Sequence, residues 1–180
     1  LQGLFQNMGG RRARPRKVKI REARKLLADE EASRFINEED IASWKLSAEP
    51  DGGTARIAIA RVGDNPAIKD DLEGIGLYEL DGGRGYLVLS SQGNDTYAVY
   101  RREGDHAYVG SFAVVADGAR GIDGISETDG LDVSSRNLGP GYEHGAMVAQ
   151  DGRNVLPVEN QNYKIVSWEA IARALGLEMR

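Results

Sequence analysis

The sequence predicts an all-β fold built from repeated units, and three observations support this prediction. The 180 residues include 23 glycines and only 7% aromatic residues, which is typical of a turn-rich β protein. Residues 71–95 have the pattern of a strand, a glycine-rich turn and a second strand. The pattern recurs along the chain. Units of about four short strands at intervals of roughly 50 residues indicate a β-propeller, whose blades surround a central channel.

The repeat is visible in both strands of the unit. If Glu39, Gln92 and Gln150 are equivalent strand ends, they lie 53 and 58 residues apart. The entering strand at residues 73–77 has a counterpart at residues 129–133, which begins 56 residues later. Acidic residues at the start of each innermost strand would therefore converge on one mouth of the channel.

From Ile41 onward, the expected elements are separated by Gly, Pro, Asn and Asp residues that favour turns. Strands are expected at roughly residues 41–47, 55–62, 74–80, 85–91, 96–102 and 107–115. Near the end, Ser167 can cap a short helix that Gly176 terminates. The apolar face of that helix would comprise Trp168, Ile171, Ala172 and Leu175.

The composition excludes several kinds of site. The absence of cysteine rules out disulfides, zinc ribbons and a cysteine-nucleophile phosphatase. His106 and His144 do not lie in an Arg-His-Gly setting, so a histidine phosphatase is not indicated, and both are expected in surface loops. No stretch of about 18 apolar residues suggests a membrane span, and residues 1–5 do not have the pattern of a signal peptide.

The charge is unevenly distributed. Residues 1–25 carry nine Lys or Arg and one acid, whereas residues 26–180 carry 14 basic and 27 acidic residues. The basic run at residues 11–17 could bind nucleic acid or a polyphosphate. Because no aromatic platform is interleaved with these charges, we favour a disordered, solvated arm at residues 1–20 over a nucleic-acid site.

Residues 71–95 also gather oxygen-bearing side chains. Asp71 and Glu73 lie two positions apart, so both project from one face of an extended strand, and Gln92 ends the next strand. Carboxylate and amide oxygens suit a hard cation such as calcium better than zinc or copper. The alternative is a pair of solvated acids beside a turn. An EF-hand around Gly130 is excluded, because Ile125 would take its first ligand position.

Eight motifs, in the same order, make the chain resemble the β-propeller phytases, which are calcium-dependent phosphatases of inositol hexakisphosphate. Together they cover roughly residues 28–176. They are EED at 38–40, WKLSAEPDGG at 44–53, DLEG at 71–74, GYLVLSSQGND at 85–95, DGISETDGLDV at 123–133, LGP at 138–140, VAQDG at 148–152 and NQNYKIVSWEAIA at 160–172.

The resemblance implies about three four-stranded blades of a six-bladed ring. They are expected at roughly residues 21–65, 66–117 and 118–180. It also implies two strands within residues 21–36, although the composition of this segment favours helix. The third blade is expected to lack its own outer strand, because the chain turns helical after Lys164–Trp168.

Carried over residue by residue, the resemblance implies a set of calcium ligands at the channel mouth. They are Glu39, Asp71, Glu73, Gln92 and Asp129. Glu39 and Asp71 are expected to orient the attacking water, and Asp123 is expected to hold a separate, structural calcium ion. The flanking acids Glu38, Asp70, Glu127 and Asp132 are expected to face solvent or cap turns.

The function that this resemblance implies is calcium-dependent hydrolysis of phosphate monoesters of inositol hexakisphosphate (phytate) by metal-activated water. We expect it only in a complete propeller, because the family's phosphate-binding Lys and Arg residues belong largely to an N-terminal half that this chain does not contain. The alternatives are a non-catalytic calcium-binding propeller module for a protein partner, and a nucleic-acid binder acting through the basic arm. The resemblance also implies a secreted or periplasmic bacterial protein.

Overall fold

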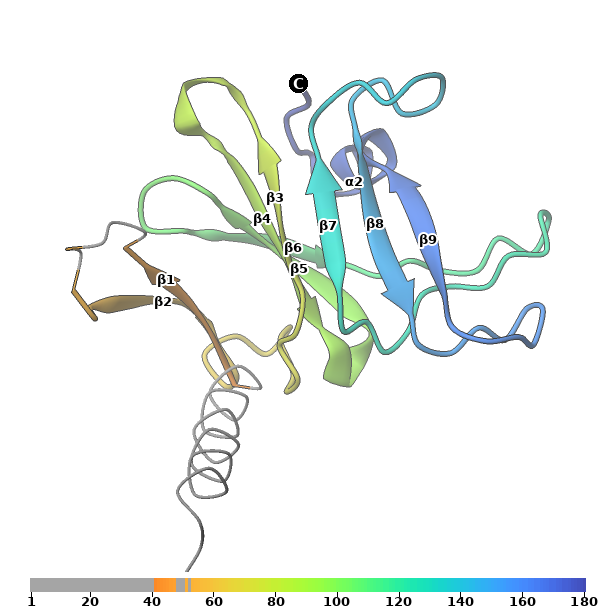
Figure 1. The fold of residues 1–180 in the computed structure, drawn as a ribbon, viewed down its shortest axis with the longest axis horizontal. Helices are drawn as coiled ribbons and strands as arrows, with labels where there is room; N and C mark the ends of the chain where they lie inside the picture. Colours follow the sequence, from red (N-terminus) through yellow and green to blue (C-terminus); the bar gives the residue numbers. More distant parts are fainter. Residues whose placement is uncertain (1–40, 48–50, 52) are drawn as a thin grey trace, which may run out of the picture. The chain divides into compact units, whose positions relative to one another are not determined.

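The computed structural model describes residues 41–47, 51 and 53–180, which form three antiparallel sheets (Figure 1). The first sheet pairs β1 (Ala42–Leu46) with β2 (Arg56–Arg61). The middle sheet contains, in order, β3 (Ile75–Glu79), β4 (Gly85–Ser91), β5 (Thr96–Arg101) and β6 (Tyr108–Phe112). The third sheet contains β7 (Leu131–Ser134), β8 (Ala146–Asp151) and β9 (Asn162–Ser167), and is followed by helix α2 (Trp168–Leu175).

The predicted all-β fold with a short C-terminal helix is confirmed. All six strands expected between residues 41 and 115 are present, with ends within three residues of the predicted ones. In the described part of the chain, the third sheet has three strands before the chain turns into α2, as expected. The predictions for residues 1–20 and 21–36 fall outside the described residues. Within the described residues, no helix combines the length and apolarity that crossing a membrane requires.

The middle sheet is buried on both faces. Val88 and Val99 belong to a core shared with the third sheet, whereas Leu89 and Ala98 belong to a second core shared with Ala60 of the first sheet. Successive side chains of a strand alternate between faces, so a sheet covered on both sides needs apolar residues at consecutive positions. This explains why β4 and β5 contain continuous apolar runs.

The middle and third sheets meet along β3 and β7, which lie side by side (Figure 1). Gly74 and Gly76 of this contact leave no room for a side chain. A Cβ atom on Gly76 would lie 2.6 Å from Val133 Cγ2 and 3.0 Å from the Val133 backbone nitrogen. Glycine is therefore required for the two sheets to approach this closely.

Helix α2 packs against the core through Trp168, which is fully buried and stacks on Tyr78 with ring centroids 3.8 Å apart. Ser167 Oγ accepts a hydrogen bond from the Ala170 backbone nitrogen at 3.3 Å. Gly176 ends the helix in the left-handed conformation, with φ of 67°. The predicted cap, apolar face and stop of this helix are confirmed.

The expectation that His106 lies on the surface is wrong. Its side chain is buried, and its ring nitrogens contact the Arg101 carbonyl oxygen at 3.1 Å and Lys45 Nζ at 3.3 Å. These contacts hold the turn between β5 and β6 against the first sheet. A lone histidine in a turn carries no sequence signal for such packing.

Candidate active site at the acidic edge

The directions of the strands bring four segments to one edge of the sheets. β3 and β7 run the same way, because Gly74 lies against Leu131 and Gly76 against Val133. β4 and β8 are antiparallel to them, so they end where β3 and β7 begin. The segments before β3 and β7 therefore meet the segments after β4 and β8.

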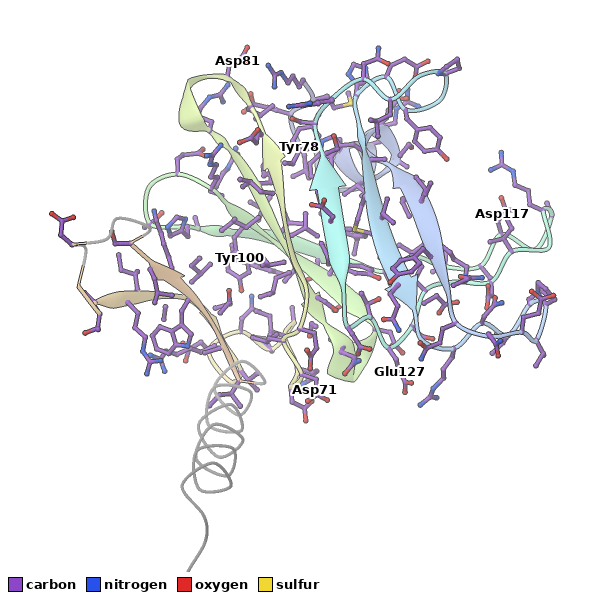
Figure 2. The ribbon with its side chains drawn as sticks, in the orientation of Figure 1. Asp71, Tyr78, Asp81, Tyr100, Asp117 and Glu127 are labelled. Carbon is purple, nitrogen blue, oxygen red and sulfur yellow. The ribbon has the colours of Figure 1, made fainter. Side chains whose placement is uncertain are left out.

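We call this place the acidic edge, and define it by Asp71, Glu73, Gln92 and Asp129. Figure 2 shows Asp71 at this edge and Asp81 at the opposite one. The first two residues precede β3, Gln92 follows β4, and Asp129 precedes β7. The topology of the described sheets thus brings these four strand ends to one edge.

The segment before β3 is tied to the end of β4 by the backbone. Asp71 adopts the left-handed conformation, with φ of 57°, which Asp tolerates better than most residues. The Gln92 backbone nitrogen donates to the Asp71 carbonyl oxygen at 2.9 Å, and the Gly93 nitrogen donates to the Asp70 carbonyl oxygen at 3.1 Å. These two bonds fix where the Asp71 side chain leaves the backbone.

A side-chain hydrogen bond joins the middle sheet to the third at this edge. Gln92 Nε2 donates to Asp129 Oδ1 at 2.6 Å, and the Asp129 backbone nitrogen donates to Gln150 Oε1 at 2.8 Å. Asp129 is thus held from two sides. Cations bind amide oxygens, so shared ligation of one cation by Gln92 and Asp129 requires the Gln92 amide to turn its oxygen toward the carboxylate.

Thr128 positions the neighbouring Asp129, although no motif in the sequence marks it as a site residue. The buried Thr128 hydroxyl donates to the Gln150 carbonyl oxygen at 2.8 Å and accepts from the Tyr97 hydroxyl at 2.6 Å. The Thr128 carbonyl oxygen accepts from Ser90 Oγ at 2.8 Å. Burial raises the pKa of Tyr97 to about 12, so its hydroxyl remains a donor at neutral pH.

The backbone hydrogen bonds correct one predicted equivalence. The Ser90 nitrogen donates to the Gly74 carbonyl oxygen, and the Gln150 nitrogen donates to the Gly130 carbonyl oxygen. Gly74 and Gly130 are equivalent positions of the repeat, so Gln150 corresponds to Ser90. The predicted equivalence of Gln150 with Gln92, 58 residues apart, is therefore wrong, because the residue equivalent to Gln150 lies two positions before Gln92. The prediction was based on the matching glutamine side chains, whereas the pairing of strands determines which positions are equivalent.

The predicted calcium ligands are only partly covered by the structure. Glu39, which we also expected to orient water, lies outside the described residues. Glu73 is exposed beside Asp71, in the segment before β3. Within residues 41–180, apart from the undescribed 48–50 and 52, no three Asp, Glu or His side chains form a group that could hold a metal ion. The carboxylate and amide oxygens present suit calcium in kind, and their assignment as ligands stays a prediction.

Asp123 lies in a different, buried cluster with Asp151 and Lys164. The Lys164 ammonium lies 2.7 Å from Asp123 Oδ1 and also pairs with Asp151 Oδ2. Asp123 Oδ2 accepts hydrogen bonds from the backbone nitrogens of Val155 at 2.5 Å and Leu156 at 3.2 Å. The Lys164 and backbone donors lower the pKa of Asp123 to about 2, so this carboxylate is charged at neutral pH.

Two features of this cluster suit a cation. Asp123 and Asp151 bring two buried carboxylates together. Asn154, whose neighbours Arg153 and Val155 donate backbone hydrogen bonds to these carboxylates, has a buried side-chain oxygen without a hydrogen-bond partner. Of these residues, only Asp123 is predicted as a calcium ligand from the sequence. Asp151 lay within the VAQDG motif and Lys164 was an isolated charge in an apolar strand, so both signals were present. What was missing was the pairing of β8 with β9, which brings them together.

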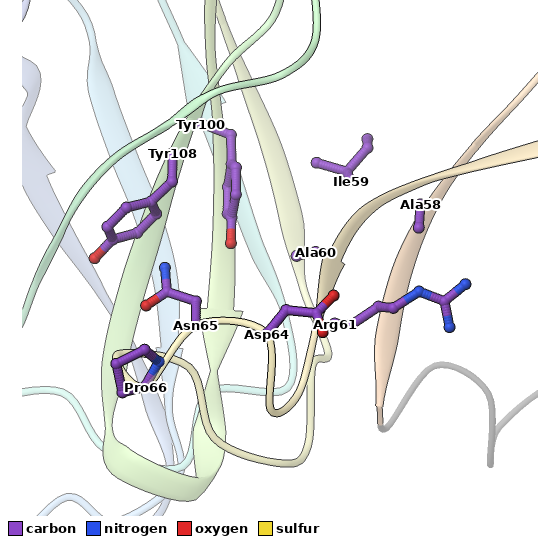
Figure 3. Close-up of a pocket in the computed structure, with 9 residues that line it drawn as sticks. All are labelled: Ala58, Ile59, Ala60, Arg61, Asp64, Asn65, Pro66, Tyr100 and Tyr108. Atoms are coloured by element: carbon purple, nitrogen blue, oxygen red, sulfur yellow. The ribbon is translucent and has the colours of Figure 1, made fainter.

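A separate pocket lies between the first and middle sheets (Figure 3). The Tyr100 and Tyr108 rings form one wall, and their centroids are 5.5 Å apart. None of the predicted site residues lines it. The pocket is lined by Ala58, Ile59, Ala60, Arg61, Asp64, Asn65, Pro66, Tyr100 and Tyr108.

Comparison with known proteins identifies the family. The sequence model of the Phytase family matches residues 4–179. The chain belongs to the phytase family. This confirms the family indicated by the eight motifs. A 3-phytase from Bacillus subtilis (strain 168) is 48% identical over 155 residues. The match covers 84% of this phytase-family chain but 40% of the relative, so the chain spans about two fifths of the relative's length.

Proposed function

We propose that this chain is the calcium-binding part of a phytase that hydrolyses phosphate monoesters of inositol hexakisphosphate. The observation that carries the proposal is the Gln92–Asp129 hydrogen bond at the acidic edge, in a chain whose family is phytase and whose relative is named 3-phytase. The bond places an amide and a carboxylate from two sheets in contact. It supports a site built between neighbouring blades rather than scattered, solvated acids.

The residues of the acidic edge would bind cations and orient water. Asp71, Glu73 and Asp129 would supply acidic oxygens and Gln92 a neutral one, while Glu39 and Asp71 would orient the attacking water. Calcium, when bound, would neutralise the phosphate charge and acidify water. The described residues at this edge are acidic, so the cationic residues that grip phosphate belong to the rest of the ring in this proposal.

Calcium dependence can be tested on the chain itself. Calcium should raise the melting temperature, because an ion that binds only the folded state stabilises it by linkage. Magnesium should raise it much less, since magnesium demands a small octahedral site. Thermal unfolding in EDTA, calcium and magnesium measures the difference. Equal stabilisation by both ions, or by neither, would contradict the calcium site.

The catalytic proposal needs the complete ring. Phosphate release from inositol hexakisphosphate should occur when the remaining blades are joined to this chain, and only with calcium present. A complete ring that binds calcium but releases no phosphate would favour the alternative, a non-catalytic calcium-binding module for a protein partner. The secreted or periplasmic location expected of such an enzyme is part of this proposal, and cell fractionation of the full protein tests it.

A further inference from the structure

The buried Asp123–Asp151 cluster contains its own cation. Asp151 is 0% exposed, Asp123 is 6% exposed, and the Lys164 side chain between them is 11% exposed. Burial lowers the pKa of Lys164, but the contacts of its ammonium with both carboxylates outweigh burial and raise this pKa. One ammonium therefore lies between two buried acidic side chains.

The equivalent positions of the middle sheet show that this charge cluster is a feature of the third sheet. In the register of the repeat, Asp151 corresponds to Ser91, because the Ser126 nitrogen donates to Asp151 Oδ1 at 3.0 Å as the Lys69 nitrogen donates to Ser91 Oγ at 2.8 Å. Strand pairing likewise places Lys164 where the middle sheet has a buried alanine: Lys164 pairs with Ala149, and Ala98 with Leu89. The third sheet thus has both Asp151 and Lys164, whereas the middle sheet has Ser91 and Ala98 at the equivalent positions.

The lysine leaves part of the cluster unsatisfied. Asp123 Oδ1 is within 2.7 Å of the ammonium, yet it lacks a well-aligned hydrogen bond. Asn154 follows Arg153, whose nitrogen donates to Asp151, and its buried Oδ1 has no partner. One ammonium has three donors and cannot meet every oxygen, whereas a calcium ion accepts six to eight.

We propose that the Lys164 ammonium is a built-in occupant of this cluster, which holds Asp123 and Asp151 together without calcium and which calcium must displace in order to bind. The inference rests on the calcium dependence in the proposed function. Displacement exposes two carboxylate charges, which match a divalent cation. Asp123 and Lys164 both line one pocket, so the Lys164 side chain has space to move into. Lys164 thereby sets the calcium concentration at which the metal binds between Asp123 and Asp151.

The test is a calcium titration of thermal unfolding, begun in EDTA, on the unaltered chain and on Lys164→Met. In EDTA the variant should melt at a lower temperature, because two buried carboxylates lose their partner. Its half-saturating calcium concentration should fall about tenfold, because the variant lacks the ammonium that competes with calcium for the two carboxylates. Lys45→Met, which removes a positive charge from the first sheet, should leave the half-saturating concentration unchanged.

The outcomes separate this inference from the proposed function. The tenfold fall should persist in an Asp129→Asn background, because that change alters the acidic edge and not the cluster. Equal half-saturating calcium for the unaltered chain and Lys164→Met would overturn the competition while leaving calcium binding intact. If calcium changes the melting temperature of neither protein, both the competition and the proposed calcium binding are contradicted. If Lys164→Met does not fold in EDTA, NMR of the Lys164 ammonium in the unaltered chain decides: calcium should release it to solvent, and an unchanged signal at saturating calcium would refute displacement.

Discussion

Single acidic residues in this chain have distinct environments that their sequence neighbours do not reveal. Glu127 pairs with Arg153, and Asp132 Oδ1 accepts a hydrogen bond from the Val133 nitrogen at 2.8 Å. Both contacts stay within the third sheet and the segments next to it. Asp129, between them in the sequence, instead bonds across to Gln92 of the middle sheet. The Glu127 and Asp132 carboxylates therefore bond within the third sheet and its adjoining segments, whereas the Asp129 carboxylate between them reaches another sheet.

Replacing the acids of the acidic edge should separate activity from folding. In the complete ring, Asp71→Asn or Glu73→Gln should leave the melting temperature in EDTA within a few degrees, but abolish most phosphate release, because each removes a charge while keeping side-chain size. Phosphate release at saturating calcium measures the effect. Asp81→Asn, in an exposed turn at the opposite edge, is the matched control. Near-normal turnover of the Asp71 and Glu73 variants would show that the channel mouth is wrongly assigned.

Tyr100 should make the chain sensitive to alkali. Burial, and then the neighbouring Tyr108, raise the pKa of Tyr100 to about 12, above its ordinary value of 10. The unfolded chain would lose this proton first, so the contribution of Tyr100 is fully present below pH 10 and is lost between pH 10 and about 12. Urea unfolding at pH 8, 10 and 11 should show the free energy of unfolding falling less steeply in Tyr100→Phe. If the free energy of unfolding falls equally steeply with pH in the unaltered chain and in Tyr100→Phe, this prediction is contradicted.

At the level of elements, the sequence predicted the strands well because turn residues separate them clearly. Gly93, Asn94 and Asp95, for example, mark the end of β4, and β4 was located to the residue. The positions that are equivalent between sheets were harder to predict from the sequence. Gln150 has the same residue type as Gln92, but its backbone hydrogen bond corresponds to that of Ser90. Buried pairs such as Asp151 with Lys164 were not predicted, because they depend on which strands pair and on a two-sided burial that local patterns do not encode.

The contact between β3 and β7 should be the most sensitive to added volume. Gly76→Ala places a methyl group within 2.6 Å of Val133 and must push the middle and third sheets apart. We expect it to lower the free energy of unfolding by about 1–3 kcal/mol. Gly118→Ala is the control, because a Cβ there meets no atom within 4 Å. Chemical unfolding of both variants measures the difference, and equal losses would show that the two sheets are not tightly apposed.

At the scale of the described sheets, burial is unequal. The middle sheet is covered on both faces, whereas β9 at the edge of the third sheet exposes Tyr163 and Ile165 by 72% and 57%. Val158 in the preceding loop is 85% exposed. Apolar side chains on an open strand edge favour association with another strand or sheet. In a complete ring, a neighbouring blade would cover them.

The isolated chain should therefore be marginally stable, prone to self-association and without phytase activity. Sedimentation velocity and phosphate release measure both properties. Mixing it with the separately produced remainder of the ring should restore a single species and calcium-dependent phosphate release, because the added blades cover the open edge and supply the phosphate-binding cations. A monomeric 180-residue chain that hydrolyses phytate unaided would overturn this expectation.

The hydrogen bond from Gln92 to Asp129 has a consequence for how such proteins can be recombined. The sheets divide the chain between β6 and β7, but the acidic edge extends from Asp71 to Asp129 and so crosses that division. A chimera with its crossover in residues 113–122 would inherit Gln92 from one parent and Asp129 from the other. A crossover in the loop at 135–145, after β7, keeps both from the same parent. A segment that can be exchanged without dividing the acidic edge must therefore contain β7 of the third sheet together with the strands of the middle sheet.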